Sequence, residues 1–284
     1  MATIQQTQQH IRQSIQEAYP EPEAGAIAQR LLQHVLQKSR LELSLKQQEE
    51  VEPAQEESIN EAIKRLQEHE PIQYVLQEAH FYGLDLYVDK RVLIPRPETE
   101  ELVDLIVKEH QGQRELQILD VCTGSGCIPI ALATNLNTEK VYGLEVSDGA
   151  LEVAEINAAK YNLSIRWLHQ DVFEPLQSVA PASLDIITSN PPYVLELEKE
   201  QMRENVLEYE PHLALFVLNT DPLKYYKRIA ALAHNLLKEG RGLYFEINER
   251  YGQEVKQLVL DNGFSRAEVV QDLYGKDRIV KALK

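Results

Sequence analysis

A stiff loop that carries an amide, a free carbonyl and an aromatic ring is the stretch of this chain best suited to chemistry. Ser189-Asn190-Pro191-Pro192-Tyr193 follows the apolar run 184–188. The two prolines fix φ near about −65° and remove two backbone donors, so the loop is rigid and its carbonyls face no competing amides. Such a loop suits a small planar group that carries an NH2. A plain turn is the alternative interpretation, because Asn-Pro often opens turns.

A second candidate loop contains two glycines and runs directly into a predicted helix. It follows the strand-like run 117–121 and reads Cys122-Thr123-Gly124-Ser125-Gly126-Cys127. Glycines let the backbone come close to a ligand at a helix N-terminus. About twenty residues later the next predicted strand ends at Glu145, where a carboxylate can accept hydrogen bonds from a ribose diol. The pair predicts a cofactor that contains a nucleoside.

Pro129 separates two cofactor classes that this pattern could serve. The dinucleotide fingerprint has a third glycine at this position, beside a pyrophosphate. Proline is tolerated there because the first turn of a helix leaves its N–H groups without partners. The sequence therefore favours a cofactor without a pyrophosphate, S-adenosylmethionine, over NAD. Asp171 could accept from the adenine amino group while Val172 and Phe173 sandwich the ring, or Asp171 could simply cap a turn.

Alternating strand and helix patterns from residue 116 onward predict an α/β fold with a mostly parallel sheet. Loops at the carboxyl ends of such strands are where open sheets bind ligands. A helix is predicted over 97–110, with acids in its first turn. The predicted strands are 117–121, 141–146, 165–169, 184–188 and 242–247, the predicted helices are 127–136, 148–161, 222–237 and 252–262, and 268–273 with 277–283 form a closing antiparallel pair.

The first 78 residues have apolar positions at three- and four-residue spacing, which predicts a small helical bundle. Helices are expected around Ile4–Ala18, Ile27–Leu36 and 54–68. A β-hairpin is predicted between His80 and Val88, around Gly83. We therefore expect a helical domain over 1–78, a hairpin linker over 79–96 and a catalytic domain over 97–284. Arg96, between two prolines, is either a hinge anchor or a surface charge.

Composition excludes several other classes. The 284 residues hold 29 Lys and Arg against 45 Asp and Glu, a net charge of −16, which disfavours broad nucleic-acid binding. The two cysteines form no CxxC motif, so neither a disulfide framework nor a metal site is expected. No apolar run approaches the roughly 18 residues of a membrane span. We expect a soluble cytoplasmic monomer without metal.

The chain resembles class I S-adenosylmethionine-dependent methyltransferases, and more narrowly the PrmC/HemK family of protein-(glutamine-N5) methyltransferases. The resemblance spans nearly the whole sequence. Its motifs are Phe81-Tyr82-Gly83, Leu93-Ile94-Pro95-Arg96-Pro97-Glu98-Thr99-Glu100, Thr123-Gly124-Ser125-Gly126-Cys127, Asn190-Pro191-Pro192-Tyr193, Tyr209-Glu210-Pro211 and Asp277-Arg278. The stretch before the glycine loop is more specific than Asn-Pro-Pro-Tyr, which nucleic-acid amino-methyltransferases share.

The resemblance implies a Rossmann-like seven-stranded sheet and methylation of the glutamine in the Gly-Gly-Gln motif of peptide chain release factors, with S-adenosylhomocysteine as the other product. Asn190 and the Pro191 carbonyl would hold the substrate amide, and Tyr193 would pack on its plane. Leu93, Arg96, Glu98 and Pro192 would complete the substrate site. Residues 122–127, Glu145, Asp171, Val172, Phe173 and Asn190 would bind the cofactor. We expect the helical domain to dock the release factor.

Four departures from the family pattern affect these expectations. Cys122 stands where the first glycine of the loop is usual, and Glu145 replaces the commoner Asp. Gln77 and Asn248 also stand where glycine is frequent. The main alternative function is an adenine-N6 or cytosine-N4 nucleic-acid methyltransferase, which would need a basic groove that this chain does not offer. A non-catalytic nucleoside-binding protein is a further alternative, and it would not need the Asn-Pro-Pro-Tyr loop.

Overall fold

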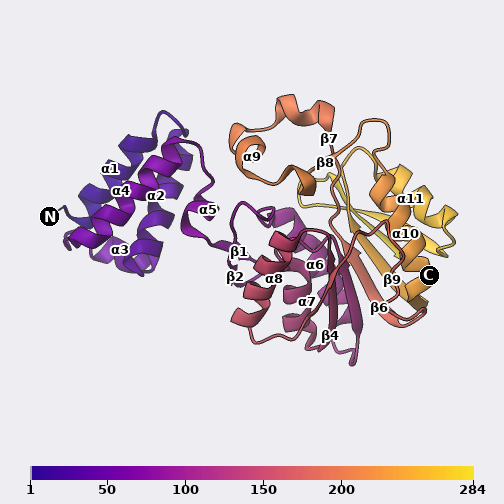
Figure 1. Ribbon diagram of the computed structural model, residues 1–284. Coiled ribbons are helices and arrows are strands. Elements are labelled where there is room, and N and C mark those ends of the chain that lie inside the picture. Colours follow the sequence, from indigo (N-terminus) through magenta and orange to yellow (C-terminus); the bar gives the residue numbers. More distant parts are fainter. Residues whose placement is uncertain (1) are drawn as a thin grey trace. The chain divides into compact units, whose positions relative to one another are not determined.

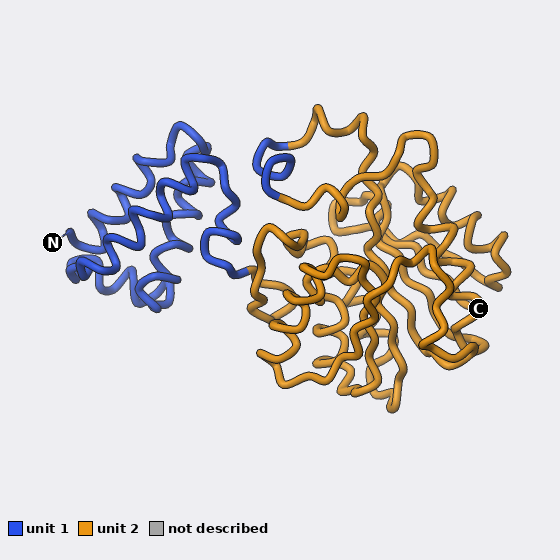
Figure 2. The backbone as a smooth tube through the Cα atoms, viewed as in Figure 1, with its two compact units in different colours: residues 1–78, 203–209 blue, residues 79–202, 210–284 orange. Residues whose placement is uncertain are grey.

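The computed structural model describes residues 2–284, which divide into two compact units (Figures 1 and 2). Unit 1 extends to Glu78 and includes the separate segment 203–209, drawn in blue in Figure 2. Unit 2 comprises 79–202 and 210–284, so that residues 79–96 belong to it. Each unit is described by itself below.

Unit 1 is a bundle of helices around its own apolar core. The long helices are α1 (Ile4–Ile15), α2 (Glu21–Leu36) and α4 (Pro53–Gln67), which confirms the three predicted segments. Thr3 and Gln6 form a capping box at the start of α1, which satisfies backbone donors that a helix leaves open. The short helices α3 (Arg40–Leu45) and α5 (Ile72–Leu76) were not predicted, because six and five residues carry too little periodicity.

Helix α9 (Glu204–Tyr209) is distant in sequence from the rest of unit 1 but folds with it. The Tyr209 hydroxyl donates a hydrogen bond to the Glu68 carbonyl at 2.6 Å. Arg203 Nη1 lies 3.2 Å from Glu23 Oε1. This association could not be predicted from the sequence, since α9 is only six residues long and has no buried residue.

Unit 2 is built on a seven-stranded sheet in the order β10-β11-β9-β6-β3-β4-β5. Strands β9, β6, β3, β4 and β5 run parallel, β11 is antiparallel to β9, and β10 is antiparallel to β11. Parallel central strands are covered on both faces, and β6 is accordingly buried along its whole length, its polar residues Asp185, Thr188 and Ser189 included. The strands are β3 (Gln117–Val121), β4 (Lys140–Glu145), β5 (Arg166–His169), β6 (Leu184–Ser189), β9 (Leu237–Glu246), β10 (Arg266–Gln271) and β11 (Asp277–Leu283).

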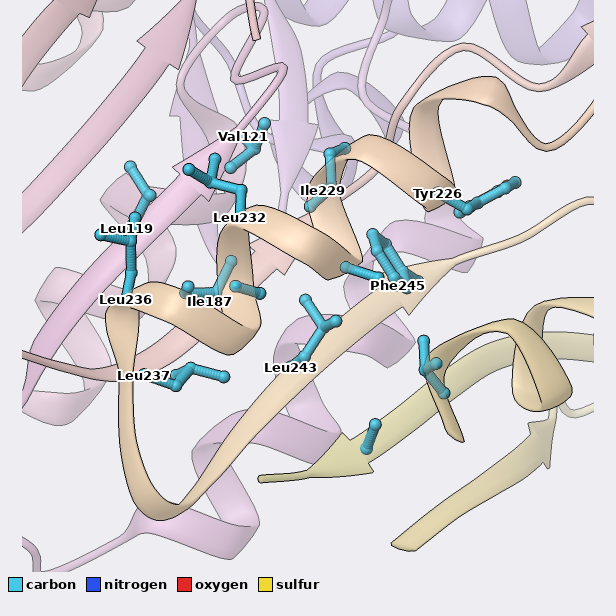
Figure 3. Close-up of a cluster of buried hydrophobic side chains, with 14 of the residues drawn as sticks. Leu119, Val121, Ile187, Tyr226, Ile229, Leu232, Leu236, Leu237, Leu243 and Phe245 are labelled. Carbon is cyan, nitrogen blue, oxygen red and sulfur yellow. The ribbon is translucent and has the colours of Figure 1, made fainter. Parts of the chain in front are cut away.

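Helices cover both faces of this sheet. One apolar cluster joins the sheet to α10 (Lys224–Leu236) and α11 (Gly252–Asp261), and Figure 3 shows Tyr226 and Ile229 from α10 with Leu243 and Phe245 from β9 in this cluster. The other cluster joins it to α6 (Pro97–His110), α7 (Cys127–Leu136) and α8 (Asp148–Lys160). The predicted closing pair and all four helices of the α/β region are therefore confirmed, with boundaries that shift by at most two residues.

Strand β9 differs most from its prediction, because it starts at Leu237 rather than residue 242. Leu237 both caps α10 and pairs with Leu184, so the helix passes into the strand without a loop. The pairing register then shifts before Ile186 meets Gly242. An apolar residue that serves a helix end and a strand start gives no turn signal in the sequence.

Smaller elements complete unit 2. The predicted hairpin is confirmed as β1 (Ala79–Phe81) and β2 (Leu84–Leu86), joined through Tyr82 and Gly83. A parallel pair of short strands, β7 (Val194–Leu195) and β8 (Phe216–Val217), and the short 3-10 helices η1 (Glu196–Gln201) and η2 (His212–Ala214) were not predicted. Within residues 2–284, no helix combines the length and apolar character that crossing a membrane requires.

Candidate active site

A cavity of about 270 Å³ lies in unit 2 where the carboxyl ends of β3, β4, β5 and β6 meet. This edge of a parallel sheet is where open α/β folds bind ligands. The structure brings most of the predicted site residues to its wall: Leu93, Arg96, Cys122, Thr123, Gly124, Ser125, Cys127, Glu145, Asp171, Val172, Phe173, Asn190 and Pro192. Four predicted residues do not line it: Glu98, Gly126, Pro191 and Tyr193.

The glycine loop approaches the cavity with its backbone. Gly124 has φ of 52°, and a Cβ placed on it would meet no atom within 4 Å, so this turn of backbone faces open space. Gly126 caps α7 with φ of 78°, and a Cβ there would lie 3.1 Å from Ile130 and 3.2 Å from Ala154. Gly126 therefore provides close packing of α7, while Gly124 leaves room for a ligand.

Cys122 keeps the conformation that a glycine would adopt at its position. Its φ is 63°, in the left-handed region that L-residues rarely occupy. Gln77, another position where glycine is frequent, has φ of 54°. Both residues thus hold a left-handed backbone that favours glycine and strains an L-residue. Burial raises the pKa of the Cys122 thiol, with further contributions from the Glu145 and Asp120 carboxylates, which keeps the thiol protonated and weakly nucleophilic.

Glu145 fastens the end of β4 to the glycine loop. Its Oε2 accepts the backbone N–H of Gly124 at 2.9 Å. Its Oε1 accepts the N–H groups of Val146 at 2.9 Å and Ser147 at 3.1 Å. A carboxylate has about four acceptor positions, so one remains for a ligand hydroxyl. Glu145 therefore has a structural task in addition to the predicted contact with a ribose.

Asp120, one residue before the end of β3, was not predicted to belong to the site. It is fully buried, and its Oδ2 accepts the Thr123 hydroxyl at 2.5 Å. Its Oδ1 has no hydrogen-bond partner among the described residues. Burial, together with the Glu145 charge, raises the Asp120 pKa to about 8 although the Thr123 hydrogen bond opposes the shift. The group therefore holds its proton at neutral pH.

The third strand end supplies a carboxylate and an apolar wall. Asp171 Oδ1 accepts the Phe173 N–H at 2.9 Å, so Asp171 does cap a turn while also lining the cavity. Val172 is buried beside it, and the Phe173 ring lies 5.3 Å from that of Tyr225. Lys224 Nζ lies 5.0 Å from the Phe173 ring centroid. This wall suits a flat ring, and Tyr225 is a member that the sequence did not reveal.

The Asn-Pro-Pro-Tyr loop is held from beneath by hydrogen bonds. Asn190 Nδ2 donates to Thr99 Oγ1 at 3.2 Å, and the Tyr193 hydroxyl donates to Glu246 Oε1 at 2.9 Å. Tyr193 thus points toward a buried carboxylate and not into the cavity, so packing on a substrate plane stays a prediction. Asn248, where glycine is frequent, donates to the Tyr193 carbonyl at 3.3 Å and adds to the support of the loop.

The rim of the cavity also joins two segments that are far apart in the sequence. Arg96 Nη2 donates to Glu210 Oε1 at 2.6 Å, and Glu210 Oε2 accepts the Ile94 N–H at 3.1 Å. Pro211, Leu213 and Ala214 follow and line the cavity. Arg96 is therefore anchored, although it also lines the cavity. Glu210 belongs to the Tyr209-Glu210-Pro211 motif, but the sequence did not predict that it pairs with Arg96.

No cluster of three or more His, Cys, Asp or Glu side chains within residues 2–284 could hold a metal ion. The polar groups that line the cavity are the amides of Asn190 and Gln170, carboxylates, hydroxyls, and the cations of Arg91, Arg96 and Lys224. The amides, carboxylates and hydroxyls fit an uncharged amide and a nucleoside-containing ligand.

Both the N-terminal and the α/β part of the chain match known protein families. Residues 6–76 match the domain family described as PrmC N-terminal domain, and residues 99–212 match the methyltransferase small domain. A release factor glutamine methyltransferase from Bacteroides thetaiotaomicron is 44% identical over 273 residues, 96% of this chain and 97% of that protein. One from Flavobacterium psychrophilum is 46% identical over 220 residues, 76% of each chain.

A solved structure shares the architecture of unit 2. The crystal structure of a methyltransferase from Pyrococcus furiosus matches with a TM-score of 0.52 and 17% identity, covering 71% of this chain and 89% of that one. At this identity the likeness concerns the fold alone. The class I methyltransferase fold predicted from the sequence, with its last strand pair antiparallel, is confirmed.

Proposed function

This chain belongs to the release factor glutamine methyltransferase family, and from that membership we propose the reaction it catalyses. The protein transfers a methyl group from S-adenosylmethionine to the side-chain amide nitrogen of a glutamine, the one in the Gly-Gly-Gln motif of a peptide chain release factor. The observation that carries the proposal is the placement of Asn190, which lines the cavity with its amide nitrogen engaged by Thr99.

The cavity supports S-adenosylmethionine as the cofactor. The open backbone at Gly124 leaves space for a ligand at the N-terminus of α7, and Glu145 retains acceptor capacity for a ribose diol. Val172, Phe173 and Tyr225 offer an apolar wall for adenine. When bound, S-adenosylmethionine supplies a methyl group made electrophilic by its sulfonium.

The residues of the chain act on the acceptor nitrogen. An amide nitrogen is a weak nucleophile because its lone pair is delocalised into the carbonyl. Asn190 Oδ1 accepts one N–H of the substrate amide, and the carbonyl of Pro191, which follows Asn190 in the chain but does not line the cavity, accepts the other. The two bonds direct the lone pair and stabilise the positive charge that develops. Alignment of two reactants can contribute about 7–11 kcal/mol. The amide of Asn190 cannot take up the proton, which leaves to solvent after transfer.

The helical N-terminal domain docks the release factor in this proposal, and the protein works as a monomer. The PrmC N-terminal match over residues 6–76 supports a conserved task for this part of the chain. Its glutamine-rich and acidic surface offers hydrogen bonds and negative charge to a protein partner. A nucleic acid is the less suitable partner because of the net charge of −16.

A single assay tests this function. The protein is incubated with S-adenosylmethionine labelled in the methyl group and with a release factor, the same factor carrying Ala in place of the motif glutamine, or duplex DNA. Label should enter only the unchanged factor, and mass spectrometry should locate it on that glutamine. Label in the Ala variant or in DNA would contradict the proposal.

A further inference from the structure

A buried chain of hydrogen bonds lies behind Asn190 and connects three elements of unit 2. The Thr99 hydroxyl, in the first turn of α6, donates to Glu246 Oε2 at 2.6 Å at the end of β9. The Tyr193 hydroxyl donates to the other oxygen of the same carboxylate. Thr99 is 2% and Glu246 1% exposed, so water does not compete for these bonds. None of these links involves the cofactor loop.

The direction of each bond follows from the donors available. A hydroxyl has one proton, and Thr99 gives its proton to Glu246. Thr99 Oγ1 can therefore only accept from Asn190, and the group of Asn190 that can donate is its NH2, at 3.2 Å. The amide oxygen of Asn190 must then point the other way. Rotating the amide by half a turn would set two acceptors against each other unless Thr99 withdrew its proton from a buried carboxylate.

We infer that Thr99 and Glu246 are positioning residues that select the amide orientation of Asn190, so that Oδ1 and not Nδ2 is presented to the acceptor amide. The inference rests on the proposed function, because only a substrate NH2 requires an acceptor at this point. An amide in the opposite orientation would present its own NH2 to the substrate NH2, and two donors repel. Asn190 alone, without this support, would sample both orientations.

The charge surrounding Glu246 is consistent with this task. The carboxylate accepts two hydroxyl protons, and its pKa is raised chiefly by burial, an effect that the bonds from Thr99 and Tyr193 and the nearby Arg278 cation oppose. Arg278 itself binds Asp272 at 3.2 Å. Glu246 thus accepts one hydroxyl proton at each of its two oxygens, from Thr99 and from Tyr193.

The test measures the orientation directly and then its effect on catalysis. In protein labelled with ¹⁵N-asparagine, the Asn190 side-chain NH2 is identified as the signal lost in Asn190→Ala. Its hydrogen exchange should be protected in the wild type and at least tenfold faster in Thr99→Val, which has the same shape without the hydroxyl. Thr99→Ser, which restores the hydroxyl, should restore protection. Equal exchange in wild type and Thr99→Val would overturn the inference.

Catalysis should follow the same order. In single-turnover methylation of a release factor, Thr99→Val should lower the rate at least tenfold and Thr99→Ser should recover most of it, while the Kd for S-adenosylmethionine stays within about threefold. Val103→Ala, a fully buried change on the same helix outside the hydrogen-bonded chain, is the control for loosening of α6. An equal loss in this control would show that Thr99 acts only through helix packing and would overturn the inference.

A second variant, at the Glu246 end of the hydrogen-bonded chain, keeps the inference testable if Thr99→Val does not fold. Glu246→Met leaves the Thr99 hydroxyl in place but removes its acceptor, so the exchange of the Asn190 NH2 should also quicken. Unchanged exchange would contradict the role of Glu246. Since the exchange experiment needs no substrate, an inactive wild type would contradict the proposed function while leaving the orientation measured.

Discussion

Arg96 Nη2 donates a hydrogen bond to Glu210 Oε1 at 2.6 Å, although the two residues lie 114 positions apart in the sequence. The two side chains differ in exposure: that of Glu210 is 1% exposed and that of Arg96 34%. The carboxylate also fixes the Ile94 N–H, so the pair determines the path of the segment that lines the cavity. The difference in exposure means that the two partners are not equally replaceable.

We expect Arg96→Met to lower the free energy of unfolding by about 3 kcal/mol, because it leaves a buried carboxylate without its cation. Glu210→Gln should cost only about 1 kcal/mol, since the partly exposed guanidinium can turn to water and the Gln oxygen can still accept from Ile94. Denaturant unfolding of the two variants measures the difference. Equal losses, or a larger loss for Glu210→Gln, would contradict this account of the rim.

Asn190→Ala should lower the rate of methyl transfer at least 100-fold, the effect of removing one group that stabilises charge in a transition state. The affinity for S-adenosylmethionine should stay within a few-fold, because the glycine loop and Glu145 are untouched. Single-turnover rates and calorimetry measure the two quantities. A variant with near-normal turnover on a release factor would remove Asn190 from the reaction.

Glu145→Gln should raise the Kd for S-adenosylmethionine about tenfold or more, which is about 1.4 kcal/mol. The Gln amide has the shape of Glu but sets its NH2 against either the Gly124 N–H or the N–H groups of Val146 and Ser147, so the loop loses a backbone bond. Glu155→Gln on α8, an exposed change of the same charge, serves as the control. Matching Kd values for the two variants, measured by calorimetry, would exclude Glu145 from the cofactor site.

Asp120 makes stability depend on pH. Its folded pKa of about 8 lies above the unfolded value near about 4, so between these pH values the native state keeps a proton that the unfolded state has released. The contribution of protonated Asp120 to the free energy of unfolding is complete below about pH 4. It is lost as pH rises toward 8, by up to about 1.4 kcal/mol per pH unit. Asp120→Asn never ionises.

The stability of Asp120→Asn relative to the wild type should therefore increase by roughly 3 kcal/mol between pH 5 and pH 8. Denaturant unfolding at several pH values provides the curves, and Asp261→Asn at the exposed end of α11 controls for the change in net charge. Parallel curves for wild type and Asp120→Asn would show that Asp120 is ionised in the folded protein.

Gln77→Gly should raise the free energy of unfolding by about 1 kcal/mol, because glycine relieves the left-handed backbone at the end of α5. Gln77→Ala removes the same side chain but keeps the strain, and it isolates the backbone term. Thermal and denaturant unfolding should show a higher free energy of unfolding for Gln77→Gly than for Gln77→Ala. The reverse order would mean that the side chain, and not the backbone angle, determines stability here.

The sequence predicted the sheet because its signals are local. The runs at 117–121 and 277–283 have the exact bounds of β3 and β11, since the glycine loop follows the first and the turn around Gly275 precedes the second. The carboxyl ends of parallel strands share an edge, so the glycine loop, Glu145, Asp171 and Asn190 could be assembled without coordinates. Their gathering around one cavity follows from that rule.

The supporting residues could not be predicted because their partners are set by tertiary packing. Thr99 and Glu246 lie 147 positions apart and meet only because α6 packs beside β9. In the sequence Thr99 is one polar residue in an acidic helix start, and Glu246 is a carboxylate after an apolar run. Neither pattern distinguishes a buried acceptor from a surface charge.

The membership of residues 203–209 in unit 1 determines how this protein can be recombined with its relatives. A chimera that exchanges only the first 78 residues would pair the Tyr209 and Arg203 of one protein with foreign counterparts of Glu68 and Glu23. Residues 203–209, which are encoded more than 120 codons after residue 78, must therefore be exchanged together with the N-terminal segment. Inheritance of the helical unit is therefore discontinuous along the gene, and covariation between the two stretches is expected across the family.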